Sequence, residues 1–216
     1  GFRNVTASRS KILINNRPVF MRGNLDCLHF PLTGYPSCDI QEWERIFSIY
    51  KSYGLNHVRF HSWCPPEAAF TAADRIGIYI QAEVLWIDWW MSVVRKERPE
   101  MTTRGLPKGL GHNPSADKFV PEELQRMIEA YGNHPSFTML CIGNELGNSN
   151  FDIMQQWIKS LQEKDPRRLY AISTARKIMP ADQYMVTHNI PQTGGTYGIN
   201  GSGTDNDRES IYSKAT

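Results

Sequence analysis

The chain has 216 residues, of which 40% are hydrophobic and 11% aromatic, enough apolar material for the core of one large domain or two small ones. Its 24 basic and 22 acidic residues give a formal net charge of +2 and are spread along the sequence, which argues against nucleic acid or a membrane surface as a partner. No apolar stretch approaches the roughly 20 residues that a membrane-spanning helix requires.

The first 20 residues predict a β-hairpin. Polar and apolar residues alternate on both sides of the turn-forming sequence Asn15-Asn16-Arg17-Pro18. From Val19 the chain continues into a first core strand that ends in polar residues at Asp26. We therefore expect residues 1–20 to form a hairpin that leads into the main domain.

Residues 19–164 predict a strand followed by a helix, four times in succession. The predicted strands are 19–26, 55–61, 78–85 and 137–142, and the predicted helices are 39–52, 67–76, 121–131 and 152–164. This alternation is typical of right-handed crossover units and a parallel sheet, either open or closed into a barrel.

The remaining segments are less regular. Residues 168–173 and 184–188 predict a fifth and a sixth strand, with a weak or missing helix between them. Residues 86–114 form a long connection that contains Trp86, and connections of this length are usually functional or mobile. Glycine and aspartate dominate residues 191–216, which we expect to be loop or partly disordered.

Neither cysteine nor histidine spacing indicates a metal site. The chain has four cysteines without a Cys-x-x-Cys pair, and its six histidines lack a His-x-x-x-His or His-Glu-x-x-His pattern. We therefore expect free thiols, no bound metal and no other cofactor.

Polar side chains end every predicted strand of the main domain. In a parallel α/β sheet the carboxyl ends of the strands share one edge, and ligands bind there. Each residue also has a structural interpretation, such as an ion pair for Arg59, a buried hydrogen-bonded position for His61 or attachment of a loop for Glu83. The residues at this predicted edge are Asp26, Arg59, His61, Glu83, Asn144, Glu145 and His188.

Glu145 has two interpretations. It follows a nearly all-apolar run at 137–142, so it either lies at the end of a buried strand as a functional carboxylate, or Asn144 caps the next helix and Glu145 belongs to its first turn. Carboxylates, an arginine and tryptophans together are typical of a sugar site, in which aromatic rings stack on pyranose rings and carboxylates act as acid and base. An apolar setting supplied by Trp63 and Trp86 would raise the pKa of a general acid.

Several of these segments resemble glycoside hydrolase family 2, the β-galactosidase and β-glucuronidase type. Residues 14–23 are similar to the segment that leads into the family's first barrel strand, and residues 55–59 are similar to its second strand. The most specific similarity is Asn133-His134-Pro135-Ser136 followed by Gly143-Asn144-Glu145, which resembles the fourth strand. One departure is Leu25-Asp26-Cys27-Leu28-His29, where the family usually has a histidine followed by glutamate, so the sugar specificity of its better-known members is not carried over.

The resemblance implies a (β/α)₈ TIM barrel over residues 19–190 that acts on β-linked sugars with retention of configuration. It implies that Glu145 is the acid/base, that Asn144 binds a sugar 2-hydroxyl, and that Arg59 lies beneath the sugar. The other expected sugar-binding residues are Asp26, His61, Glu83, Trp86 and His188. The nucleophilic glutamate belongs on the seventh strand, and no carboxylate after Glu145 ends an apolar run. We therefore expect about six strands of eight, no nucleophile and no activity in the isolated chain.

The expected partner is a carbohydrate, together with further domains of the same full-length protein. The expected location is extracellular or periplasmic, although this chain shows no signal sequence. One alternative is a non-catalytic carbohydrate-binding or structural remnant of a glycosidase barrel. Another is a different enzyme class on an open parallel sheet, which the lack of a Gly-x-Gly-x-x-Gly or phosphate loop disfavours.

Overall fold

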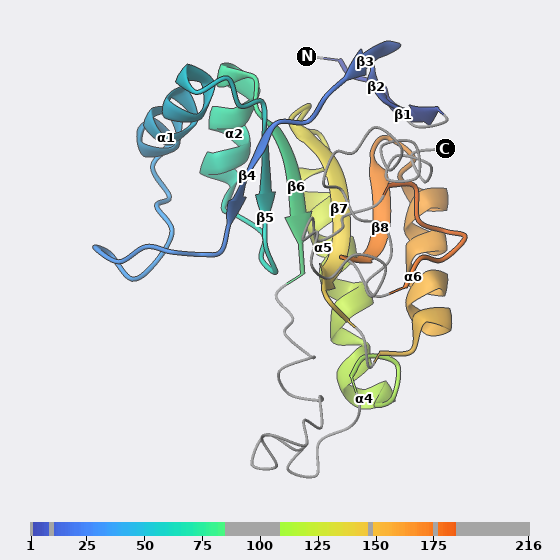
Figure 1. Ribbon diagram of the computed structural model, residues 1–216. Coiled ribbons are helices and arrows are strands. Elements are labelled where there is room, and N and C mark those ends of the chain that lie inside the picture. The colour runs from blue at the N-terminus through green and yellow to red at the C-terminus, as the bar shows by residue number, and fades with distance from the viewer. Residues whose placement is uncertain (1, 9–10, 85–108, 147–148, 175–176, 185–216) are drawn as a thin grey trace, which may run out of the picture.

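The computed structural model describes residues 2–8, 11–84, 109–146, 149–174 and 177–184 (Figure 1). Its main feature is a five-stranded sheet in the order β4-β5-β6-β7-β8, and all four strand pairs are parallel. The strands are β4 (Gly23–Asp26), β5 (His57–Phe60), β6 (Tyr79–Glu83), β7 (Phe137–Asn144) and β8 (Leu169–Thr174). In the described residues β4 and β8 are open edges, so the sheet is not a closed barrel.

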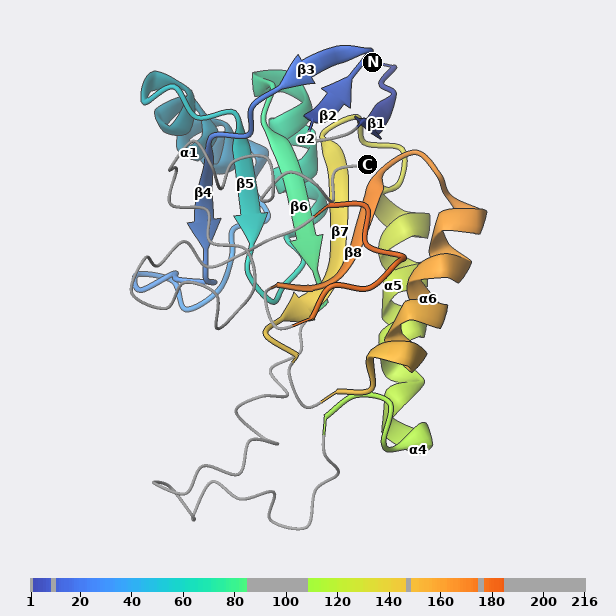
Figure 2. The same ribbon diagram turned by 45° about the vertical axis from the view of Figure 1, so that its right-hand side comes forward.

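Strand order follows chain order without reversal, which distinguishes this sheet from a doubly wound one. Right-handed crossovers that always step in one direction place their helices on one face of the sheet, as in the wall of a barrel. Figure 2 shows the helices on that face. They are α1 (Ile40–Ser52), α2 (Glu67–Ile76), α5 (Phe119–Tyr131) and α6 (Phe151–Lys164), whereas the short α4 (Pro114–Asp117) lies at the lower end of α5 in this view.

Local signals explain why the helix boundaries match the predictions closely. The Asp39 side chain caps α1 by accepting a hydrogen bond from the Gln41 amide at 2.9 Å. Helix α2 begins after Pro66 and ends at Gly77, whose φ of 81° is left-handed. The short helix α4 was missed, although Pro114 at its first position is a recognised start signal.

Residues near the N-terminus form a separate antiparallel sheet of three strands, β1 (Val5–Ser8), β2 (Lys11–Ile14) and β3 (Arg17–Val19). The β2–β3 hairpin turns at Asn15 and Asn16, whose φ angles of 51° and 63° are left-handed, a conformation that asparagine tolerates. The predicted hairpin is therefore present, and β1 pairs with β2 as a third strand.

Two apolar cores lie on opposite faces of the parallel sheet. The larger core joins the strands to the helices and contains Trp43, Phe47, Phe60 and Trp63. The smaller core lies on the inner face, where Met139, Cys141, Leu169, Ala171 and Tyr184 pack with Val5 of β1. Since Ala7 and Ile12 pack against the same core, the antiparallel sheet covers part of the inner face.

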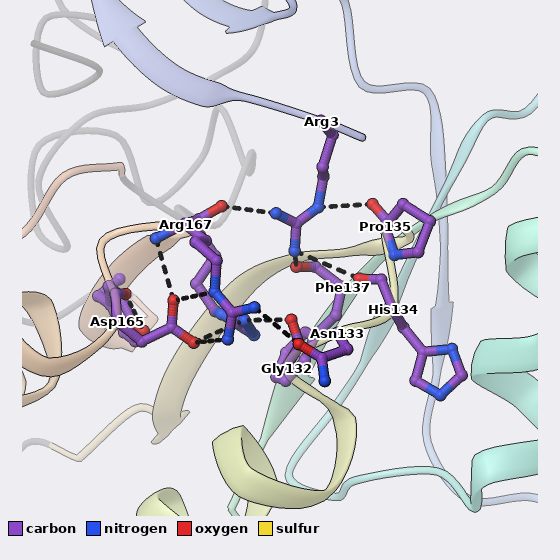
Figure 3. A network of polar contacts seen from close by, with 10 residues as sticks. Arg3, Gly132, Asn133, His134, Pro135, Phe137, Asp165 and Arg167 are labelled. Atoms are coloured by element: carbon purple, nitrogen blue, oxygen red, sulfur yellow. Dashed lines mark hydrogen bonds and ion pairs between the residues drawn. The ribbon is translucent and has the colours of Figure 1, made fainter. Parts of the chain in front are cut away.

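Arg3 fastens this antiparallel sheet to the amino ends of β7 and β8 (Figure 3). Its guanidinium donates to the carbonyls of Pro135 at 2.6 Å, Arg167 at 2.6 Å and His134 at 3.3 Å, and also to that of Phe137. Burial, together with Arg168 and Arg167 nearby, lowers the pKa of Arg3 to about 10. The guanidinium thus binds three carbonyls that precede β7 and β8 and the carbonyl of Phe137, the first residue of β7.

Three predicted segments cannot be compared in full. Most of the 86–114 connection and all of 191–216 lie outside the described residues. Of the predicted sixth strand only Tyr184 is described, and it lies in a bend.

Candidate active site

The carboxyl ends of β5, β6 and β7 bring three of the predicted residues into direct contact. Arg59 donates from Nε to Glu83 Oε1 at 2.7 Å and from Nη2 to Asn144 Oδ1 at 3.0 Å. The Arg59 side chain is 12% exposed and that of Glu83 is fully buried. Residues far apart in the sequence thus form one polar network on the inner face.

Glu83 accepts two further hydrogen bonds. Gln81 Nε2 donates to Oε1 at 3.1 Å, and the Ser62 backbone amide donates to Oε2 at 2.7 Å. Burial lowers the pKa of Arg59, but the charge of Glu83 and its hydrogen bond outweigh burial and raise that pKa above its ordinary value. Arg59 therefore remains charged although it is largely enclosed.

The structure decides between the two interpretations of residues 144–145. Asn144 is the last residue of β7 and is 6% exposed, whereas α6 begins at Phe151. The helix cap is Asn150, whose side chain accepts from the amides of Asp152 at 3.1 Å and Ile153 at 3.3 Å. Glu145 is therefore a carboxylate at a strand end and not part of a helix start.

The backbone at Glu145 is left-handed, with φ of 53°, a conformation that is uncommon for residues other than glycine. Leu28 and Ser62 are also left-handed, with φ of 60° and 59°, and they closely follow β4 and β5. Such residues persist only where the surrounding structure stabilises them, and they are common at functional sites. At Glu145 the next amide, that of Leu146, donates to Ser173 Oγ of β8 at 3.0 Å.

His61 and Asp26 lie beside this network. The His61 amide donates to the Asp26 carbonyl at 2.8 Å, and Leu28 N donates to Asp26 Oδ1 at 2.9 Å. Burial and the Arg59 charge lower the pKa of His61, and the charges of Glu83 and Glu145 oppose this shift. Burial raises the pKa of Asp26, which the Leu28 amide and His29 partly offset.

Trp63 contributes to the core and not to a sugar-stacking surface. It is 4% exposed, its ring lies 4.8 Å from that of Phe60 and 5.9 Å from that of Phe30, and its Nε1 donates to the Asp26 carbonyl at 3.1 Å. The other two predicted members of the site, Trp86 and His188, lie outside the described residues.

Sequence reasoning missed Gln81, Ser62 and Tyr184. Gln81 alternates with Glu83 on β6, a period-two signal that marks the same face of the strand. No sequence signal marks Ser62, because its role depends on the backbone amide. Tyr184 is 3% exposed in the inner core, and burial raises its pKa well above the ordinary value.

Within the described ranges, no group of three or more histidine, cysteine, aspartate or glutamate side chains has the arrangement of a metal site. In the same ranges, no helix is both long enough and apolar enough to cross a membrane.

A family model described as "Glycosyl hydrolases family 2, TIM barrel domain" matches residues 5–190. The chain belongs to glycosyl hydrolase family 2. This confirms the predicted family and the TIM-barrel class, of which the five parallel strands form an incomplete wall.

Solved structures with this fold include members of the same family. A family 2 glycosyl hydrolase from Bacteroides cellulosilyticus shares 20% identity at a TM-score of 0.65, covering 91% of this chain and 25% of that one. The β-glucuronidase of Parabacteroides merdae shares 21% at 0.61, covering 80% of this chain and 20% of that one. Bacteroides uniformis β-glucuronidase 3 shares 20% at 0.59, covering 80% of this chain and 21% of that one. The chain thus spans a quarter or less of each of these three proteins.

Proposed function

We propose that the natural polypeptide that carries residues 1–216 is a glycoside hydrolase that cleaves β-linked sugars with retention, and that Glu145 is its general acid/base. The observation that carries this proposal is the position of Glu145, which directly follows the buried strand β7 and the Asn144 that Arg59 holds at 3.0 Å. Family membership supports glycoside hydrolysis in general, and this position supports the specific role.

In this proposal Glu145 protonates the leaving glycosidic oxygen and then accepts a proton from the attacking water. Asn144 accepts from Arg59 through Oδ1, so its Nδ2 is the side of the amide that donates to a sugar hydroxyl. Arg59 lies beneath the sugar, and Asp26, His61, Trp86 and His188 line the rest of the subsite.

Retention requires a second carboxylate about 5 to 5.5 Å from the first. In the described residues after Glu145, Asp152 and Glu163 belong to α6, Asp165 caps its end, and Asp182 accepts from the amides of Ile172 and Met179. None of these follows a strand of the parallel sheet. In the sequence beyond the described residues, Asp205, Asp207 and Glu209 do not end an apolar, strand-like run either. On this basis we propose that the nucleophile comes from outside residues 1–216 and that these residues alone do not turn over substrate.

The test is hydrolysis of a panel of aryl β-glycosides by the natural polypeptide and by two variants. For the members of the panel with poor leaving groups, such as phenyl β-glycosides, we expect Glu145→Gln to lower kcat/KM by about 10²- to 10⁴-fold, the usual range for loss of a general acid/base. The control Glu163→Gln changes an exposed carboxylate of α6 and should leave the rate unchanged. Hydrolysis by the 216-residue chain itself would contradict the proposal about the nucleophile.

Sugar binding without hydrolysis, unaffected by Glu145→Gln, would instead favour a non-catalytic carbohydrate-binding protein. For the natural polypeptide we further propose additional domains, since this chain covers only 20% to 25% of the three solved structures above. We also propose an extracellular or periplasmic location. Cell fractionation with an antibody against residues 1–184 tests both statements, through the compartment and the mass of the detected protein.

A further inference from the structure

Glu83 is the most enclosed charged group at the carboxyl ends of the described strands. Its side chain is fully buried, and three donors from three different residues converge on its two oxygens. A carboxylate in this setting has no exposed surface at which to receive a sugar hydroxyl, and the three donors occupy most of its acceptor positions. Its contacts are instead directed at Arg59 and at the backbone after β5.

We propose that Glu83 is a positioning residue, which fixes the Arg59 guanidinium against Asn144 and makes no contact with the sugar. In one respect this inference rests on the proposed function, because Asn144 and Glu145 benefit from that position only if they act on a glycoside. The proposal replaces the sequence-based prediction that Glu83 binds the sugar directly.

The geometry shows how the restraint works. Glu83 Oε1 holds Nε of the planar guanidinium at 2.7 Å, and Gln81 Nε2 fixes the same oxygen from its own strand at 3.1 Å. With Nε fixed, the planar guanidinium directs Nη2 toward Oδ1 of Asn144 on β7, which is separated from β5 by β6. The Asn144 amide is thereby held in one of its two flipped orientations.

Ser62 fixes the other carboxylate oxygen. Its left-handed backbone, with φ of 59°, accompanies an amide that donates to Oε2 at 2.7 Å. Strain of this kind persists only where the surroundings compensate for it, and the charge-assisted hydrogen bond to Glu83 is such a compensation. The loop that carries His61 is therefore tied to the same carboxylate.

The negative charge of Glu83, and not only its volume, is required for this positioning role. Arg59 is largely enclosed, so removal of the Glu83 charge leaves the guanidinium without a counter-charge, and the guanidinium can then form other contacts. Glu83→Gln keeps the size and one acceptor oxygen but removes the charge. Glu83→Asp keeps the charge on a side chain that is shorter by one methylene group.

The test combines a spectroscopic measurement with a kinetic cycle on the natural polypeptide. With arginine labelled selectively with ¹⁵N, the Arg59 Nε–H signal should exchange slowly with solvent in the native protein. It should exchange at least tenfold faster in Glu83→Gln and recover in part in Glu83→Asp. The matched control is Glu44→Gln, which breaks the exposed Arg75–Glu44 pair at 2.8 Å and should leave the Arg59 signal unchanged.

In the kinetic cycle, Glu83→Gln should lower kcat/KM for an aryl glycoside by about 10- to 100-fold, as expected for loss of orientation. Combined with Arg59→Ala, it should lower kcat/KM no further than Arg59→Ala alone, because Glu83 acts through Arg59. Thermal melting confirms that each variant is folded, and Glu83→Asp remains informative if Glu83→Gln does not fold.

Unchanged exchange of Arg59 in both Glu83 variants, or full additivity in the cycle, would overturn the proposal. If the native polypeptide hydrolyses no glycoside, the proposed function fails, whereas the Arg59 signal still decides whether Glu83 positions that side chain.

Discussion

Replacement of Asp165 by asparagine should destabilise the fold strongly, because it removes the partner of a fully buried arginine. Asp165 Oδ2 lies 2.9 Å from Arg168 Nη2, and Arg168 is 0% and Asp165 4% exposed at the side chain. Arg168 also donates to the Gly132 carbonyl at 3.0 Å and lies 4.3 Å from the centre of the Phe137 ring. These remaining contacts do not supply a negative charge.

The expected loss is about 3 to 5 kcal/mol of unfolding free energy, the range for removal of one partner from a buried ion pair. The second pair of Asp165, with Arg167 at 2.7 Å, adds little because Arg167 is 49% exposed. Since asparagine keeps one acceptor oxygen, a value near the lower end is expected.

Urea unfolding followed by tryptophan fluorescence measures this loss, because Trp43 and Trp63 are buried in the core between sheet and helices. The control is again Glu44→Gln, whose pair with Arg75 is 31% to 58% exposed and should contribute less than about 1 kcal/mol. Equal, small effects of Asp165→Asn and Glu44→Gln would refute the conclusion that burial makes the Asp165–Arg168 pair important.

Three further predictions concern stability. Burial lowers the pKa of His57 to about 4, so between about pH 6.5 and pH 4 the unfolded state binds more protons than the folded state. Acidification through this range should therefore remove about 3 kcal/mol of unfolding free energy from the native protein. The His57→Gln variant lacks the titrating group and should not show this loss. Gly23→Ala places a Cβ 2.7 Å from His57 Cδ2 and should destabilise by about 1 to 3 kcal/mol, with recovery when His57→Ala is added; thermal melting of the double variant checks this. Asn150→Ala removes the cap of α6 and should cost about 1 kcal/mol in urea unfolding, whereas Lys159→Ala, at an exposed position of the same helix, serves as the control.

The elements of the fold could be predicted from the sequence where their signals are local. Asp39 before α1 and Gly77 after α2 act on the backbone within a few residues, so the sequence around them carries the whole signal. The strand end at Asn144 was predictable for a similar reason, because the apolar run before it stops abruptly. The alternative that Asn144 caps the next helix could be excluded only from the structure, in which α6 begins at Phe151.

The connections within the site depend on strand register and could not be predicted in this way. Arg59 was predicted to lie at the same sheet edge as Glu83, but the contact between them follows from β5 pairing with β6 through Arg59 and Gln81. The part played by Ser62 is a backbone hydrogen bond, which residue type does not encode. Tyr184 approaches the inner face from a bend that follows β8, a position set by tertiary packing.

The most direct test of the central claim is the dependence of hydrolysis on the leaving group. A general acid protonates the departing oxygen, so its loss matters for poor leaving groups and hardly for those that depart as stable anions. For the natural polypeptide, we predict that Glu145→Gln nearly abolishes hydrolysis of phenyl β-glycosides but retains formation of the glycosyl-enzyme intermediate from dinitrophenyl β-glycosides, seen as a burst of dinitrophenol. An equal reduction of both reactions would contradict the assignment of Glu145 as the acid/base.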